Sequence, residues 1–213
     1  MSMSEFFDMY GKMMVDATIT HLAYVFISVG LGFIIALILG ILLSRLPRIS
    51  KIALPLISIF QTIPGLVFIG VLFIYLGMVP ITVIIALTIY SIFPILKNTY
   101  TGILDVDKSI KKAARGCGMT NRQILLRVEL PLASNAIFNG LRMSTIYTVS
   151  WAVLAAMIGL GGLGEFIYRG ISTNNNTLIV GGAVPAAILA ILLGFIIDRV
   201  QKKVTPRGLQ RRD

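Results

Sequence analysis

The chain alternates between long uncharged apolar segments and shorter polar ones. A helix rises about 1.5 Å per residue, so roughly 20 apolar residues cross the hydrocarbon core of a bilayer. Five segments meet this requirement and are predicted to be membrane-spanning helices, near residues 20–44, 52–76, 79–98, 138–160 and 178–199. The pattern therefore predicts an all-α polytopic membrane protein in which residues 1–213 form a single transmembrane domain.

Residues 52–96 carry no charge over about twice the length of one span, so a turn is expected inside them. The run Gly77-Met78-Val79-Pro80 supplies the turn residues. The Gly-rich run 159–164 (GLGGLG) is expected to interrupt the helix that follows the fourth span.

Pro64 lies in the middle of the predicted span 52–76, within Gln61-Thr62-Ile63-Pro64-Gly65. Pro64 removes a backbone donor and predicts a kink. Because Gln61 is polar at membrane depth, we expect it to face the interior of the bundle. Two interpretations stay open: a structural kink with a hydrogen bond to a neighbouring helix, and a role for Gln61 and Thr62 in a transport pathway.

The longest polar interruption is 105–131, and its first part predicts a short basic helix. Asp107 is suited to be its N-cap. An apolar stripe and an opposing basic side follow at helical spacing. The stripe consists of Ile110, Ala113, Ala114 and Cys117. Gly116 and Gly118 are expected to end the helix, because glycine tolerates the left-handed turn that usually stops one.

The second part of the interruption predicts another short helix. Thr120-Asn121-Arg122-Gln123 has the pattern of a capping box, which marks a helix start. Leu130-Pro131 is expected to end this helix, since proline disfavours helix in the residue before it.

Composition agrees with a membrane protein. The chain is 56% hydrophobic and 13% charged, whereas about 25% of the residues of a soluble domain are charged. The net charge of +10 comes from basic residues beside the apolar segments, which favours topology over nucleic-acid binding. The segments after spans one, three and five hold 3, 8 and 6 Lys/Arg, and the others hold only Lys12 and Arg169. The positive-inside rule then places the N-terminus outside and both the loop 105–131 and the C-terminus in the cytoplasm.

The loop 105–131 resembles the EAA loop of ABC importer permeases, which reads Glu-Ala-Ala, three residues, Gly, nine residues, Ile, any residue, Leu-Pro. The matching positions are Ala113, Ala114, Gly118, Val128, Leu130 and Pro131. Lys112 stands where the family has glutamate. The resemblance implies the type I ABC importer permease fold, in which this loop is the coupling helix that docks on an ATPase subunit. It implies that Ala113, Ala114, Gly118, Leu130 and Pro131 serve coupling. It also implies a second permease subunit, the same or paralogous, an extracytoplasmic solute-binding protein and a location in the bacterial cytoplasmic membrane.

Three further stretches, 59–66, 90–104 and 161–171, resemble the osmoprotectant branch of these permeases. That resemblance implies import of solutes such as glycine betaine, carnitine or choline. Tyr90, Tyr147 and Trp151 lie on predicted spans, where their rings could either contact a quaternary ammonium or serve packing. We take Gln61, Thr62, Tyr147 and Trp151 as candidate pathway residues.

Other features limit the chemistry of the chain. No phosphate-binding GxxxxGK[ST] loop is present, so ATP would be bound by partner subunits; no enzymatic activity or cofactor is expected. His21 and the single cysteine Cys117 offer no metal-ligand set. Glu165 and Arg169 form either a simple helical ion pair or a contact for a docking partner. Two alternatives remain open: a permease for methionine or another small solute, and a self-sufficient secondary carrier, which would show internal repeats and intramembrane charges. The sequence is silent on homodimer against heterodimer.

Overall fold

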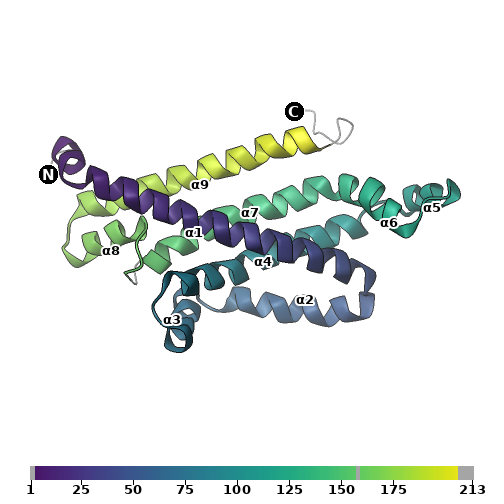
Figure 1. Cartoon of the computed structure of the whole chain (residues 1–213), viewed down its shortest axis with the longest axis horizontal. Coiled ribbons are helices and arrows are strands. Elements are labelled where there is room, and N and C mark those ends of the chain that lie inside the picture. Colours follow the sequence, from purple (N-terminus) through teal and green to yellow (C-terminus); the bar gives the residue numbers. More distant parts are fainter. Residues whose placement is uncertain (1–2, 157–158, 206–213) are drawn as a thin grey trace.

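The computed structural model describes residues 3–156 and 159–205, and within these ranges the chain is helical with no strand (Figure 1). The helices are α1 (Met3–Arg45), α2 (Pro47–Thr62), α3 (Gly65–Leu76), α4 (Pro80–Leu104), α5 (Lys108–Gly116), α6 (Asn121–Ile124), the π-helix η1 (Leu125–Glu129), α7 (Leu130–Ala156), α8 (Gly164–Ser172) and α9 (Asn176–Val204). The all-α prediction is confirmed for the described residues.

Length and composition qualify three of the described helices as membrane spans: Asp8–Arg45 of α1, all of α4 and all of α9. The pair α2 and α3 qualifies as a fourth, although the chain bends by 93° between them. We expected one kinked helix over 52–76, and that is wrong: the helix is fully broken at Ile63-Pro64. α7 is 27 residues long and more polar, with Arg142 in its middle. The count of five spans therefore stays a prediction.

The glycine-containing turns lie where the sequence placed them. α3 ends at Leu76, Gly77 takes a φ of 81°, and α4 begins at Pro80. Gly159, Gly161 and Gly162 also have positive φ, and the next helix, α8, begins at Gly164. Both predicted interruptions are confirmed. Residues 157–158, which belong to the predicted span 138–160, lie outside the described residues.

The long helices pack lengthwise, with α4 and α7 inside and α9 outside (Figure 1). α7 contacts α1, α4 and α9 along its length. The most apolar window of α4 is 56% buried, against 33% for α1 and 22% for α9. α8 lies at the end of the bundle that holds the N-terminus, and α5 and α6 lie at the opposite end (Figure 1). The loop 105–131 is therefore a terminal structure that projects from the bundle.

Small residues allow α1, α4 and α7 to approach closely. A Cβ on Gly140 of α7 would lie 2.9 Å from the carbonyl oxygen of Pro94 and 3.1 Å from Cα of Ile95, both in α4. Hydroxyl groups also join the three helices: Ser144 donates to the carbonyl of Ser91 at 2.8 Å, and Ser91 donates to that of Ser28 at 3.3 Å. Close approach and interhelical hydrogen bonds are how helices associate in lipid, where hydrophobic burial gives little driving force.

Candidate functional site

Helix α5 begins at the cap that the sequence predicted. The carboxylate of Asp107 accepts a hydrogen bond from the backbone N–H of Ser109 at 2.7 Å. This backbone bond, together with a bond from the Ser109 side chain, lowers the pKa of the Asp107 carboxyl below its ordinary value of 3.8. The N-cap prediction is confirmed.

No residue of α5 is buried. Most of the predicted apolar stripe is therefore uncovered by the described residues: Ile110 is 43% exposed, and Ala113 and Cys117 are exposed as well. Ala114 is half-buried. A basic helix that exposes Ile110, Ala113 and Cys117 can contact another molecule through that face.

The end of α5 is a tight, glycine-dependent turn. Gly118 has a φ of 77°, in the left-handed region. Its N–H donates to the carbonyl of Arg115 at 2.9 Å, and the N–H of Met119 donates to that of Ala114 at 3.1 Å. These two bonds form a Schellman motif, which satisfies the last carbonyls of the helix. A Cβ on Gly118 would meet nothing within 4 Å, so the need for glycine there arises from backbone conformation and not from crowding within this chain.

The second helix starts as predicted but does not end as predicted. Thr120 and Gln123 form the reciprocal capping box, with bonds of 3.3 and 2.8 Å. The chain then continues from α6 through η1 into α7, and Leu130 keeps helical angles of −63° and −45°. The expectation that Leu130-Pro131 ends the helix is wrong. Pro131 instead lies inside this continuous helix, two residues after the π turn ends, where it donates no backbone hydrogen bond.

The predicted coupling residues therefore fall into two groups. Ala113, Ala114 and Gly118 lie together at the projecting end of the loop. Leu130 instead packs against the core cluster that contains Ile103. Leu130 and Pro131 thus connect the loop to the bundle and are not part of its exposed face.

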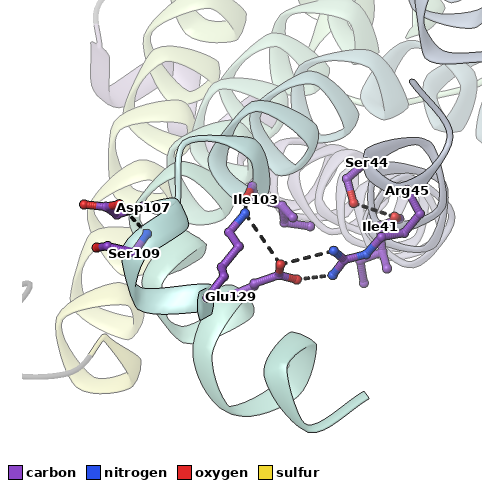
Figure 2. Close-up of polar contacts among 8 residues, drawn as sticks. Ile41, Ser44, Arg45, Ile103, Asp107, Ser109 and Glu129 are labelled. Carbon is purple, nitrogen blue, oxygen red and sulfur yellow. Dashed lines mark hydrogen bonds and ion pairs between the residues drawn. The ribbon is translucent and has the colours of Figure 1, made fainter. Parts of the chain in front are cut away.

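An ion-pair cluster that sequence reasoning missed lies at the base of the loop. Glu129, the last residue of η1, is 1% exposed. The guanidinium of Arg45, at the end of α1, forms two hydrogen bonds with its carboxylate, Nη1 to Oε1 at 3.1 Å and Nη2 to Oε2 (Figure 2). Nζ of Lys111 in α5 lies 3.5 Å from the same Oε1. The cluster is Arg45, Lys111 and Glu129; no sequence signal pairs them, because they are distant along the chain.

A hollow of about 500 Å³ opens beside this cluster. Its lining carries four cationic side chains and a single carboxylate; the residues are Arg45, Lys111, Arg115, Asn121, Arg122, Ile124, Leu125 and Glu129. The base of the loop is consequently positive, and Glu129 offsets only part of that charge.

The break between α2 and α3 is closed by reciprocal hydrogen bonds with α4. The side chain of Gln61 donates to the carbonyl of Tyr90 at 3.0 Å, and the hydroxyl of Tyr90 donates to the carbonyl of Ile63 at 2.7 Å. Pro94, four residues after Tyr90, has no N–H, so the Tyr90 carbonyl lacks its helical partner. The two helix defects thus satisfy each other. Gln61 thus makes the hydrogen bond to a neighbouring helix that its position in the span predicted.

Aromatic rings surround the same break. Trp151 of α7 stacks on Tyr90 with ring centres 4.7 Å apart, and Phe68 of α3 meets Tyr90 edge-on at 5.2 Å. Thr62 donates to the carbonyl of Ile59 in its own helix at 2.7 Å. Tyr147, one turn before Trp151, is 46% exposed. The structure therefore joins Gln61 and Trp151 in one cluster around Tyr90.

Three further residues singled out from the sequence are His21, Glu165 and Arg169. His21 is fully buried in α1. Residues 3–156 and 159–205 contain no group of three or more His, Cys, Asp or Glu side chains that could hold a metal. Arg169 lies 3.5 Å from Glu165, as a half-exposed pair within one helix.

Comparisons with known proteins relate this architecture to one family. The family model described as "Binding-protein-dependent transport system inner membrane component" matches residues 28–209. The carnitine transport permease protein OpuCB of Listeria monocytogenes is 38% identical, over 96% of this chain and 94% of its own length. The glycine betaine/carnitine/choline transport system permease protein OpuCB of Bacillus subtilis is 40% identical, over 98% and 96%. An inward-facing structure of the MetNI methionine ABC transporter has a similar fold, with a TM-score of 0.84 at 24% identity, over 97% of this chain and 100% of the other.

Proposed function

The chain belongs to the family of binding-protein-dependent transport system inner membrane components, and we propose that it serves an ATP-driven importer of osmoprotectants such as glycine betaine, carnitine or choline. Members of this family are permease subunits of ABC importers, so the chain is a multi-pass inner membrane protein and not an enzyme. Its working partners are ATPase subunits, a second permease and a substrate-binding protein. The observation that carries the substrate class is the identity of 38–40% over nearly the whole chain with carnitine, choline and betaine permeases.

The two alternatives have less support. Likeness to the methionine transporter, at 24% identity, concerns the fold and not the solute. A secondary carrier would work without a binding protein, whereas this family depends on one. The substrate test is uptake into proteoliposomes that contain the permease, its ATPase and its binding protein. We expect ATP-dependent uptake of choline, carnitine or betaine and none of methionine; methionine uptake alone would overturn the assignment.

Within this importer, the loop 105–131 serves as the coupling loop that docks on the ATPase. The exposed Ala113 and the half-buried Ala114 permit close approach of a partner surface, and the Gly118 turn sets the direction of the chain into α6. Leu130 and Pro131 contribute by holding the loop on the bundle. Lys112, in the place of the family's glutamate, is exposed as well.

A pair of glycines gives a matched test of this docking. A Cβ on Gly116 or on Gly118 would meet nothing within 4 Å, but only Gly118 has a positive φ. Gly118→Val forces an L-residue into the left-handed region at a cost of about 1–2 kcal/mol, while Gly116→Val has no such strain. We expect Gly118→Val to reach the membrane but to lose most of the co-purifying ATPase and of the solute uptake. Wild-type levels of both would show that the loop does not dock.

The proposed topology has five spans, with the N-terminus outside and the coupling loop in the cytoplasm. The spans are α1, the bent pair α2 and α3, α4, α7 and α9, and the 17 against 2 distribution of Lys/Arg supports this orientation. The exposed native Cys117 should react with an impermeant thiol reagent only from the cytoplasmic side. Thr173→Cys in a Cys117→Ser background should react from outside. Gln210→Cys, which lies outside the described residues, should behave like Cys117; the reverse pattern would contradict the five-span topology.

The solute pathway is proposed to pass the cluster at the helix break, with Gln61, Thr62, Tyr147 and Trp151 along it. The exposed face of Tyr147 and the half-buried ring of Trp151 lie one turn apart on α7, on the same side of the helix. Such rings attract a quaternary ammonium by cation–π interaction, worth roughly 0.5–2 kcal/mol. A second permease copy or a paralogue would form the opposite wall.

A further inference from the structure

Helix α5 is attached to the bundle by charge and not by apolar packing. None of its residues is buried, so its position depends on the chain at either end and on polar contacts. Lys111 makes two of these: its Nζ donates to the carbonyl of Ile103, at the end of α4, at 3.1 Å, and it pairs with Glu129 at 3.5 Å. Lys112, its neighbour along the helix, has no ion pair within the described residues.

The same carboxylate also holds the end of the first span. Arg45 is the last residue of α1, and its guanidinium meets both oxygens of Glu129 (Figure 2). Because Lys111 also contacts the end of α4, a single buried acid connects α1, α4 and α5 at the start of α7. Arg48, three residues later in α2, has no ion pair within the part of the chain that the structure describes.

We propose that Glu129 is a positioning residue for coupling, which makes the end of α1 move together with α5. The proposal rests on the docking of 105–131 on an ATPase. A buried carboxylate that loses a cationic partner is strongly destabilised, so Glu129 resists separation from Arg45 of α1 and from Lys111 of α5. A displacement of α5 by the ATPase is therefore transmitted to α1 as well as along the chain into α7. Glu129 occupies the position between Val128 and Leu130 where the EAA pattern accepts any residue, so the pattern does not mark Glu129 as functional.

The surroundings of Glu129 support a mechanical role. Glu129 ends a π-helical turn, a feature often found at functional sites. Arg115 and Arg122 line the same hollow as Arg45 and Lys111. Without the Glu129 charge these four cations would repel one another, and α5 would lose the attraction that keeps it beside α1.

The test uses the complete transporter, reconstituted with its ATPase and binding protein. Arg45→Gln is the first variant because the Arg45 side chain is 46% exposed and its loss leaves Glu129 paired with Lys111. Lys111→Gln and Glu129→Gln remove the other members. Arg48→Gln is the matched control, because Arg48 is an exposed cation of α2 that has no ion pair within the described residues. The measured quantity is the amount of solute transported per ATP hydrolysed, at equal amounts of assembled complex.

We expect this ratio to fall at least about fivefold in the three cluster variants, which is the lower end of the range for an allosteric coupling, and to stay unchanged in Arg48→Gln. The ATPase should still co-purify. The double variant Arg45→Gln/Glu129→Gln should lose no more than Glu129→Gln alone, because both remove the same interaction. Arg45→Lys should restore only part of the ratio, since lysine keeps the charge but not the bidentate geometry.

The experiment distinguishes failure of the proposed docking from failure of the proposed role of Glu129. If the wild-type chain binds no ATPase, the proposed docking is wrong. If the ATPase binds and Arg45→Gln keeps the wild-type ratio, even with a lower yield of complex, then Glu129 has a purely structural role and this inference is overturned.

Discussion

Gly65, the first residue of α3, offers a sharp test of how the broken helix is held. Its φ is not positive, so alanine is acceptable to the backbone and any cost must be steric. A Cβ there would lie 2.9 Å from Cη2 of Trp151 and closer still to two other atoms of the same ring. That ring cannot retreat freely, because it stacks at 4.7 Å on Tyr90, which is 3% exposed.

The expected cost of Gly65→Ala follows from these contacts. Overpacking a filled site costs about 1–3 kcal/mol, and disturbing the Trp151–Tyr90 stack removes about 0.5–1.5 kcal/mol more. Replacing glycine in a helix returns up to about 1 kcal/mol. The net destabilisation is roughly 0.5–4.5 kcal/mol, which lowers the Tm of a chain of this size by about 1–18 °C.

Trp151 is the only tryptophan of the chain, so its fluorescence reports the site directly. We expect Gly65→Ala to shift the emission and to lower the Tm of the purified protein. The control is Gly70→Ala, in the same helix, where a Cβ would meet nothing within 4 Å and the Tm should not fall. In a Trp151→Leu background, Gly65→Ala should cost much less. Unchanged emission together with an unchanged Tm would refute the packing argument.

Three further outcomes are expected. Trp151→Ala should lower uptake of betaine-type solutes while the complex still assembles; normal uptake, or failed assembly, would contradict the pathway assignment. Arg169→Gln removes a half-exposed ion pair and should change stability by less than about 1 kcal/mol, so a large loss of uptake with normal stability would indicate contact with the binding protein. The Asp107 cap stabilises α5 above the ordinary carboxyl pKa of 3.8, and this is lost as pH falls through the lowered folded pKa. Hydrogen exchange of α5 should therefore accelerate below that pH in the wild type and less in Asp107→Asn, whose amide caps at any pH.

Local sequence signals predicted the caps and turns well because those structures depend on neighbouring residues. The Asp107 cap, the Thr120–Gln123 box and the Gly77 and Gly118 turns each involve groups within a few positions. The span pattern likewise predicted α1, α4 and α9 as apolar helices of sufficient length.

The helix break shows where local rules stop. Pro64 predicted a kink, but the structure has a 93° bend. The carbonyl of Ile63 at the bend and the carbonyl of Tyr90 in α4 both need donors from outside their own helices. The donors are Gln61 and Tyr90, on different helices, and the Tyr90 carbonyl is available only because Pro94 follows four residues later. The sequence contains both prolines, yet nothing local pairs them. The prediction that the second helix of the loop ends at Leu130-Pro131 failed for a related reason. A π turn and the packing of Leu130 on the bundle override the usual effect of proline.

The departure of this loop from the family pattern at Lys112 gains a physical meaning from the ion-pair cluster. Adjacent lysines on a helix point about 100° apart, so Lys111 turns inward to Glu129 while Lys112 stays exposed. The acid that offsets the inner lysine is supplied within the chain. Among the described residues, Lys108, Lys112 and Arg115 have no acidic partner. The loop is therefore held to its own spans by the ion pairs of Glu129 together with the packing of Leu130, and it presents a basic face outward, which is the charge pattern expected of a helix that docks on an acidic surface.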